Sequence, residues 1–289
     1  MIKNLIIKAR KDIKLCKGLV SLMSGIMEDC IKNRKTTSIR KMGTKIALLG
    51  NGPSQEEFWE NKNKFRDYDL LCVNYFIVKF KERFYEAKPK YICFSDPMMF
   101  AFKGNLPEVE KMKEKDFNET WEIINSIDWT CYLIHPNKFK ITKLNNENVK
   151  TIELTSKSMN FDQNVSCYKL YLSNHIKPII NAVMGDALYF ALIFKYEEIA
   201  LFGVESNSLW NMEVDKNNEI IFVDKHNYGE EKLEAKKTFN TVGLHEEILS
   251  QYNYFNCFYQ LSILAKILNT KVTNYSVSSY IDSFDKKTP

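Results

Sequence analysis

The 289-residue chain has few of the residues that mark fibrous, disulfide-rich or membrane-spanning proteins. It contains ten glycines and seven prolines, which excludes collagen-like and low-complexity classes. Its seven cysteines are odd in number and never occur as Cys-x-x-Cys, which fits free thiols in a reducing compartment and argues against a structural zinc site. It lacks any apolar run of about 18 residues, so no membrane-spanning helix is predicted. These absences predict a cytoplasmic globular protein.

The positive charge of the sequence is concentrated near its start. Residues 1–45 hold twelve Lys or Arg residues against three acidic ones, a net charge of +9, whereas the whole chain has a net charge of +5. The remainder is therefore slightly acidic, which argues against a nucleic-acid-binding protein.

Residues 1–44 predict a basic amphipathic helix followed by a linker. The apolar residues at helical spacing are Leu15, Leu19, Leu22, Met23 and Ile26. Such a helix can lie on an anionic membrane surface, here the cytoplasmic face of the inner membrane. The alternative is that it packs on the domain or on another subunit, as in a homo-oligomer.

From Lys45 onward, short apolar runs alternate with helical patterns. The runs span residues 45–50, 70–73, 91–94, 130–134, 199–202 and 271–273. Nearly continuous apolar runs are typical of strands buried on both faces of a parallel sheet. The clearest helical segments are 181–195 and 244–268. This alternation predicts an α/β protein with a doubly wound, mostly parallel, Rossmann-like sheet in one domain, residues 45–289.

The first predicted strand ends in a glycine-containing turn of the kind that contacts nucleotides. Gly50, Asn51 and Gly52 precede Pro53 and Ser54, and Ser54 with Glu57 forms the capping-box pattern of a helix start. The N–H groups of a helix start attract phosphate. The turn is neither a Walker loop nor Gly-x-Gly-x-x-Gly, so a tight structural turn remains the alternative.

Polar residues also follow later strands, where ligands of doubly wound sheets bind. Asn51, Asn74 and Asp96 follow three successive strands and are expected to converge on one nucleotide. Amides suit cytosine and ribose because each offers a donor and an acceptor. After the last strand, hydroxyl groups are expected to meet the base or the phosphate; they belong to Ser276, Ser278 and Ser279.

In their order and spacing, these motifs resemble those of bacterial family-42 sialyltransferases over about residues 45–285. Residues 46–54, Ile-Ala-Leu-Leu-Gly-Asn-Gly-Pro-Ser, are similar to the first strand and CMP-sugar-contacting turn of that family. Residues 69–74 are similar to its second strand, and Ser95-Asp96-Pro97 falls where the family carries an Asn-Pro pair. Residues 196–203 resemble the strand that leads to its Gly-Ile-Asp motif.

The second half also resembles a broader set of bacterial surface-glycan biosynthesis proteins, through residues 203–210, 224–228 and 274–282. Three positions depart from the sialyltransferase pattern. Asp96 stands where that family has Asn, Glu205 where it has Asp, and Val242 where it has Tyr.

The resemblance implies an inverting glycosyltransferase with a GT-A-like variant of the fold. It would need neither a metal nor another cofactor, and would move a CMP-activated acidic sugar, similar to sialic acid, onto a bacterial surface glycan. The departures keep open the transfer of another CMP-linked group, such as Kdo or a phosphonate, onto a capsular or lipopolysaccharide glycan. A non-catalytic nucleotide- or glycan-binding protein is the alternative from another class. The resemblance also assigns nucleotide contacts to Gly50, Glu205 and Asn274.

Two histidines compete for the role of the base that deprotonates the acceptor. His226 lies in the polar segment 205–243, which is expected to form a lid, and Tyr228 is expected to donate to the phosphate. His245 begins the long helical segment, where the helix N-terminus would keep its imidazole neutral. The alternatives are an exposed loop histidine and a first-turn surface residue. The other two histidines, His135 and His175, are interpreted as structural.

Asp67 and Asp69 have the Asp-x-Asp form found in metal-dependent glycosyltransferases. They precede a predicted strand instead of following one, so we interpret them as a turn and the start of a strand. No other cluster has the spacing of metal ligands, and the sequence predicts no essential metal.

Overall fold

The computed structural model describes residues 42–100, 108–161, 168–207, 209, 212–226, 229–234 and 243–289. Within these ranges, side chains are described except at residues 108–113, 169, 222–226 and 229–234. The predicted N-terminal helix and all but residues 42–44 of its linker therefore lie outside the described residues. In the described part of the chain, no helix combines the length and the apolar character needed to cross a bilayer.

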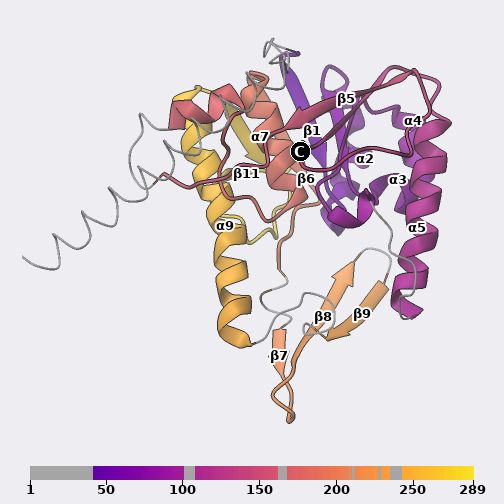
Figure 1. Ribbon diagram of the computed structural model, residues 1–289. Coiled ribbons are helices and arrows are strands. Elements are labelled where there is room, and N and C mark those ends of the chain that lie inside the picture. The colour runs from indigo at the N-terminus through magenta and orange to yellow at the C-terminus, as the bar shows by residue number, and fades with distance from the viewer. Residues whose placement is uncertain are drawn as a thin grey trace, which may run out of the picture.

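An eight-stranded sheet forms the centre of the fold, and every neighbouring pair of its strands is parallel (Figure 1). The spatial order is β11-β10-β6-β1-β2-β3-β4-β5. The strands are β1 (Lys45–Leu49), β2 (Asp69–Val73), β3 (Tyr91–Cys93), β4 (Cys131–Pro136), β5 (Val149–Leu154), β6 (Glu198–Phe202), β10 (Lys271–Asn274) and β11 (Asp285–Lys286). The predicted α/β class with a parallel sheet is confirmed, and the architecture is compatible with a Rossmann-like fold.

Strand β1 lies at the centre of this sheet. Leu48 pairs with Leu71 of β2 on one side and with Leu201 of β6 on the other. Residues 46–49 are at most 1% exposed. The apolar run that predicted a strand buried on both faces is therefore found in that environment.

Helices cover both faces of the sheet, giving three layers. One face is covered by α7 (Val183–Ile193) and α9 (Leu244–Ile267), which confirm the two predicted helical segments. The other is covered by α2 (Glu56–Glu60), α3 (Phe76–Lys79), α4 (Lys81–Ala87) and α5 (Glu108–Asn125). Successive β1 residues point to opposite faces: Leu48 packs in the α7 and α9 core, and Leu49 packs in the other.

A second, antiparallel sheet lies within the segment 205–243, for which the sequence predicts a lid. It consists of β7 (Met212–Val214), β8 (Ile220–His226) and β9 (Gly229–Glu234). Figure 1 shows this sheet apart from the main sheet, near the level of the lower ends of α9 and α5. Residues 208, 210–211, 227–228 and 235–242 lie outside the described residues. The lid therefore stays a prediction, and its strands were not anticipated.

Candidate functional site

The chain reverses its direction of travel across the main sheet at β1. From β1 it proceeds through β2, β3, β4 and β5 on one side, then returns to β6 on the other side of β1. Ligands of open parallel sheets bind beyond the carboxyl ends of the strands at such a switch point. The predicted nucleotide-contacting turn, residues 50–54, follows β1, and residues 203–205 follow β6. Both segments therefore lie at the switch point.

Hydrogen bonds close the turn 50–54 onto the segment 203–205. The Gly50 N–H donates to the Phe202 carbonyl at 2.8 Å, and the Gly52 N–H donates to the Gly203 carbonyl at 3.1 Å. The Ser54 N–H donates to Oε1 of Glu205 at 2.6 Å. An N–H group expected to face a phosphate is thus bound to a carboxylate of the same chain.

Gly50 and Gly203 allow this close approach of two backbones. A Cβ atom on Gly50 would lie 2.3 Å from the Gly203 carbonyl oxygen, and one on Gly203 would lie 2.7 Å from the Gly50 carbonyl oxygen. Gly203 also has a φ of +68°, in the left-handed region that favours glycine. Both glycines are therefore required by the contact between the two loops.

Ser54 connects three loops and does not cap a helix, so the predicted capping box is wrong. Its hydroxyl donates to the Ser276 hydroxyl at 2.6 Å and accepts from the Gly203 N–H at 3.1 Å. Helix α2 begins only at Glu56, after a 3₁₀ turn over Pro53–Gln55, and no side chain caps either. The hydroxyl is used in a tertiary contact, which overrides the local pattern.

Four buried polar atoms of the switch-point residues have no hydrogen-bond partner among the described residues. They are Asn51 Oδ1, Gln55 Nε2, Glu205 Oε2 and Asn274 Nδ2. Buried polar groups are normally hydrogen-bonded, so such atoms mark places where water or a ligand binds. The interior of the switch point thus contains acceptors and donors that the described residues leave unsatisfied.

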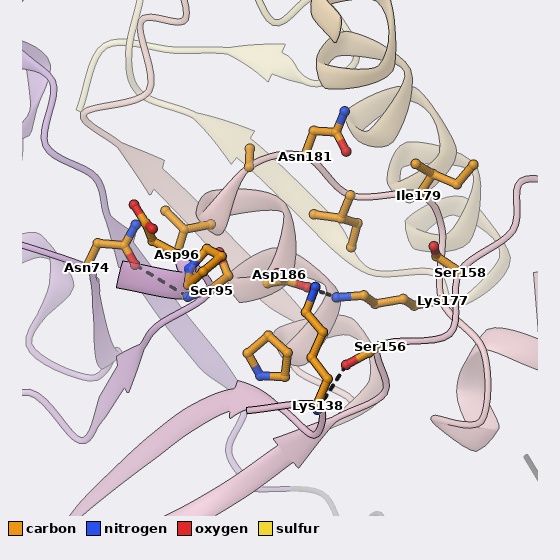
Figure 2. Close-up of a pocket in the computed structure, with 15 residues that line it drawn as sticks. Asn74, Ser95, Asp96, Lys138, Ser156, Ser158, Lys177, Ile179, Asn181 and Asp186 are labelled. Carbon is orange, nitrogen blue, oxygen red and sulfur yellow. Dashed lines mark hydrogen bonds and ion pairs between the residues drawn. The ribbon is translucent and has the colours of Figure 1, made fainter. Parts of the chain in front are cut away.

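A polar cavity of about 560 Å³ lies at the carboxyl ends of β2 to β5 (Figure 2). Its walls come from residues that follow these strands, among them Asn74, Asp96, Lys138 and Ser156, and from the segment that leads into α7. The volume lies within the range of small-molecule sites. This edge of the sheet therefore offers a preformed site beside the switch point.

The two ends of the cavity differ in chemistry, as Figure 2 shows. Asn74 and Asp96 lie at one end, where Asn74 Oδ1 accepts from the Ser95 N–H at 3.4 Å and Asp96 Oδ1 accepts from the Met98 N–H at 2.9 Å. The side chain of Lys177 lies at the other end. One end thus presents amide and carboxylate groups, and the other presents positive charge.

A buried ion pair between Lys177 and Asp186 lies at the positively charged end of the cavity. The two residues are 6% and 4% exposed, and Nζ of Lys177 donates to Oδ1 of Asp186. Burial raises the pKa of Asp186, while the charges of Lys177 and Lys138 and a hydrogen bond from Ser95 act to lower it. This carboxylate is therefore bonded to Lys177 and lies in the field of a second ammonium group, that of Lys138.

His135, on β4 next to the cavity residue Pro136, is buried, as its structural interpretation requires. It is 3% exposed, and its Nδ1 lies 3.1 Å from the Pro136 carbonyl oxygen. Burial lowers the pKa of His135 below its ordinary value of 6.5.

This histidine is expected to make the fold sensitive to acid. Because its folded-state pKa is lowered, its contribution to stability is complete above about pH 6.5 and is lost as the pH falls below that value. Below that pH, the expected loss is at most about 1.4 kcal/mol per pH unit. Urea unfolding of the native chain and of His135→Gln at pH 7 and pH 5 measures it. Equal losses of stability in the two proteins would contradict the assignment.

The structure divides the predicted nucleotide-binding residues between the cavity and the switch point. Asn74 and Asp96 line the cavity and Asn51 is not among its lining residues, so the convergence of all three on one nucleotide stays a prediction. The switch point holds Gly50, Asn51, Gly52, Ser54, Glu205, Asn274, Ser276 and Ser279.

His245 lies away from both groups. It is an exposed residue of the first turn of α9. Nine residues further along this helix, Tyr254 contacts Ser206, just beyond the switch point, through hydroxyls 2.6 Å apart. Nine residues correspond to about 14 Å along a helix axis. His245 is therefore placed well beyond the sheet edge, which supports its surface interpretation in this arrangement.

The other predicted catalytic residues are only partly within the described structure. His226 is the last residue of β8 and pairs with Gly229 of β9. Its side chain, and all of Tyr228, lie outside the described residues. Their roles as base and phosphate donor stay predictions.

Sequence reasoning did not find Lys138, Lys177 and Asp186. One signal was present for Asp186, which is the single charged residue in the otherwise apolar helix α7. A charge in such a helix is normally paired or functional. The two lysines carry no comparable signal, since one follows β4 and the other precedes α7 among ordinary loop residues.

Asp67 and Asp69 lie at the amino end of β2, away from the cavity. Asp67 pairs with Lys45 at 2.7 Å, and Asp69 pairs with Lys90 at 2.7 Å. Their interpretation as a turn and the start of a strand is confirmed. Within the described ranges, no group of three or more His, Cys, Asp or Glu residues is arranged to hold a metal ion.

Comparison with family models, curated proteins and solved structures gives no match for this chain. The resemblance to family-42 sialyltransferases therefore rests on the sequence motifs alone. The function has to be inferred from the site.

Proposed function

We propose that the protein is a transferase that uses a CMP-activated donor, similar to a sialyltransferase, and that the cavity beside the switch point binds this donor. The observation that carries the proposal is the cavity itself. It brings Asn74 and Asp96, both expected from the sequence to bind a nucleotide, into one polar pocket with two lysines. Its volume of about 560 Å³ suits a nucleotide-sized ligand.

The lining supports a cytidine nucleotide in chemical terms. Asn74 and Asn181 each offer an amide donor and an amide acceptor, and Asp96 offers acceptors for ribose hydroxyls. Asn74 is held with a positive φ of +42° directly after β2. Its side chain is thus presented from a tight turn, in a backbone conformation that Asn adopts more readily than most residues.

The proposed reaction is a single displacement with inversion. The acceptor hydroxyl oxygen bonds to the anomeric carbon of the donor, the bond from that carbon to the phosphate oxygen breaks, and its electron pair leaves with CMP. The hydroxyl proton passes to a base. His226 and His245 remain the two candidates for this base. For His245 to act, either α9 would have to move toward the cavity or the acceptor would have to extend from the cavity to His245.

The acceptor in this proposal is a bacterial capsular or lipopolysaccharide glycan made at the cytoplasmic face of the inner membrane. The basic residues 1–44 would then contact that membrane or another subunit. Because Asp96 and Val242 depart from the sialyltransferase pattern, Kdo or a phosphonate is the alternative transferred group. A protein that binds nucleotides or glycans without turnover is the alternative from another class.

Thermal unfolding with a panel of nucleotides tests the proposal. CMP and CDP at about 100 times their Kd are expected to stabilise the protein by about 2.7 kcal/mol, which raises Tm by about 5–10 °C, and EDTA should leave this shift unchanged. Asn74→Gly keeps the positive φ and should reduce the shift, whereas the exposed control Asn118→Ala should not. Stabilisation by UDP or GDP only with added metal would overturn the proposal.

Turnover distinguishes a transferase from a binding protein. Release of CMP from CMP-linked donors is expected for the native chain, and His226→Gln and His245→Gln separate the two candidate bases. The true base variant should lose at least about 100-fold in rate yet keep CMP binding. Nucleotide binding without CMP release from any donor would favour the non-catalytic alternative.

A further inference from the structure

The positively charged end of the cavity holds more cationic than anionic groups. Lys177 is 6% exposed and bonded to Asp186, which is 4% exposed. Lys138 enters from the loop after β4, and Figure 2 shows its side chain extending toward Asp186. Its charge acts on the pKa of that carboxylate. Among the described lining residues at this end, two ammonium groups therefore accompany one carboxylate, an excess of one positive charge.

Among the residues that the structure describes, no carboxylate lies within ion-pair distance of the Lys138 ammonium group. The Nζ atom of Lys138 lies 4.9 Å from the centre of the Phe139 ring, a cation–π contact. The backbone N–H of Lys138 donates to the Ser156 hydroxyl at 3.2 Å. Asp96, the other acidic residue of the lining, lies at the opposite end of the cavity in Figure 2. The excess positive charge thus stays local.

The start of α7 adds partial positive charge to the cavity. Ala182 and Val183 line the cavity, and Ala182 is the N-cap of this 11-residue helix, without a side-chain cap. The first N–H groups of a helix carry partial positive charge and bind anions. The helix start and the two lysines therefore favour one kind of ligand group, an oxyanion.

We infer that Lys138 and Lys177 bind the phosphate group of the donor. The inference rests on the proposed function, because it names the group that this end of the cavity receives. A lysine ammonium recognises phosphate as a point charge and needs no metal ion to do so. When the bond from the sugar to the phosphate oxygen breaks, negative charge grows on that oxygen, and the two ammonium groups stabilise it.

Lys138→Met tests the inference without disturbing the buried pair. Lys138 is exposed, so its replacement is expected to leave the fold intact, and the exposed Lys140→Met serves as the matched control. Titrations of cytidine and CMP are followed by calorimetry. In the native chain and in Lys140→Met, CMP should bind at least about tenfold more tightly than cytidine. In Lys138→Met, CMP should lose about tenfold in affinity while cytidine is unchanged.

The outcomes separate this inference from the proposed function. If CMP binds Lys138→Met as tightly as it binds the native chain, the phosphate lies elsewhere; the inference is then overturned and the proposed function stands. Inorganic pyrophosphate provides an arm that needs no nucleoside. Suppose that no cytidine nucleotide binds, but that pyrophosphate binds the native chain and does not bind Lys138→Met. The oxyanion site would then stand, and the proposed function would be overturned. Binding of neither ligand would overturn both.

Discussion

Replacement of Asp186 by alanine is expected to lower the free energy of unfolding by about 3–5 kcal/mol. The reason is that the ammonium group of Lys177, a residue only 6% exposed, would lose the carboxylate to which it is bonded. An uncompensated buried charge is among the most costly defects in a fold. Thermal unfolding followed by circular dichroism should show Tm falling by about 10 °C.

Two controls identify the buried charge as the cause. Asp128→Ala removes an exposed pair with Lys88, 3.1 Å apart, and should cost at most about 1 kcal/mol. The double variant Lys177→Met with Asp186→Leu replaces both charges by apolar groups of similar size and should recover most of the lost stability. A loss for Asp186→Ala no larger than that for Asp128→Ala would show that the pair is not buried as described.

The second large effect is expected at the switch point, where Gly203→Ala should cost about 2–4 kcal/mol. A side chain at φ +68° costs about 1–2 kcal/mol by itself. The new Cβ would also lie 2.7 Å from the Gly50 carbonyl oxygen, in a contact between two backbones that cannot separate cheaply. Equilibrium urea unfolding measures the loss.

Gly243→Ala is the matched control for this substitution. Gly243 has an extended φ of −172° at the N-cap of α9, and among the described residues an added Cβ would approach the exposed ring of His245, at 3.2 Å. Its replacement should therefore cost at most about 1 kcal/mol. Comparable losses at residues 203 and 243 would contradict the close packing of the two switch-point loops.

The central strands could be predicted because their environment leaves a clear pattern in the sequence. Residues 46–49 are buried on both faces, so every position is apolar and the run is recognisable. Strand β5 was missed because it is the edge strand of the sheet. Its residues Lys150, Thr151 and Glu153 are exposed, and its three buried residues do not form a continuous apolar run.

The residues of the candidate site were predictable only where they come immediately after a strand. Asn74 and Asp96 were expected at the carboxyl edge because each comes immediately after a strand, and both line the cavity. The partnership of Lys177 with Asp186 depends on how the segment before α7 folds back against its first turn, which local patterns do not encode. The predicted cap at Ser54 was wrong for the same reason, because the Ser54 hydroxyl donates to Ser276, which is 222 residues away in the chain.

The position of β1 between β2 and β6 also constrains how the protein is made. Lys45 of β1 pairs with Glu198 of β6. One edge of β1 therefore stays unpaired until β6, which is synthesised some 150 residues later, has left the ribosome. At a synthesis rate of about 5–20 residues per second, this delay is roughly 10–30 s. During that time an apolar strand edge at the middle of the future sheet is open to pairing with other chains. The nascent protein is therefore expected to depend on chaperones until β6 emerges, and truncations that end before β6 should aggregate.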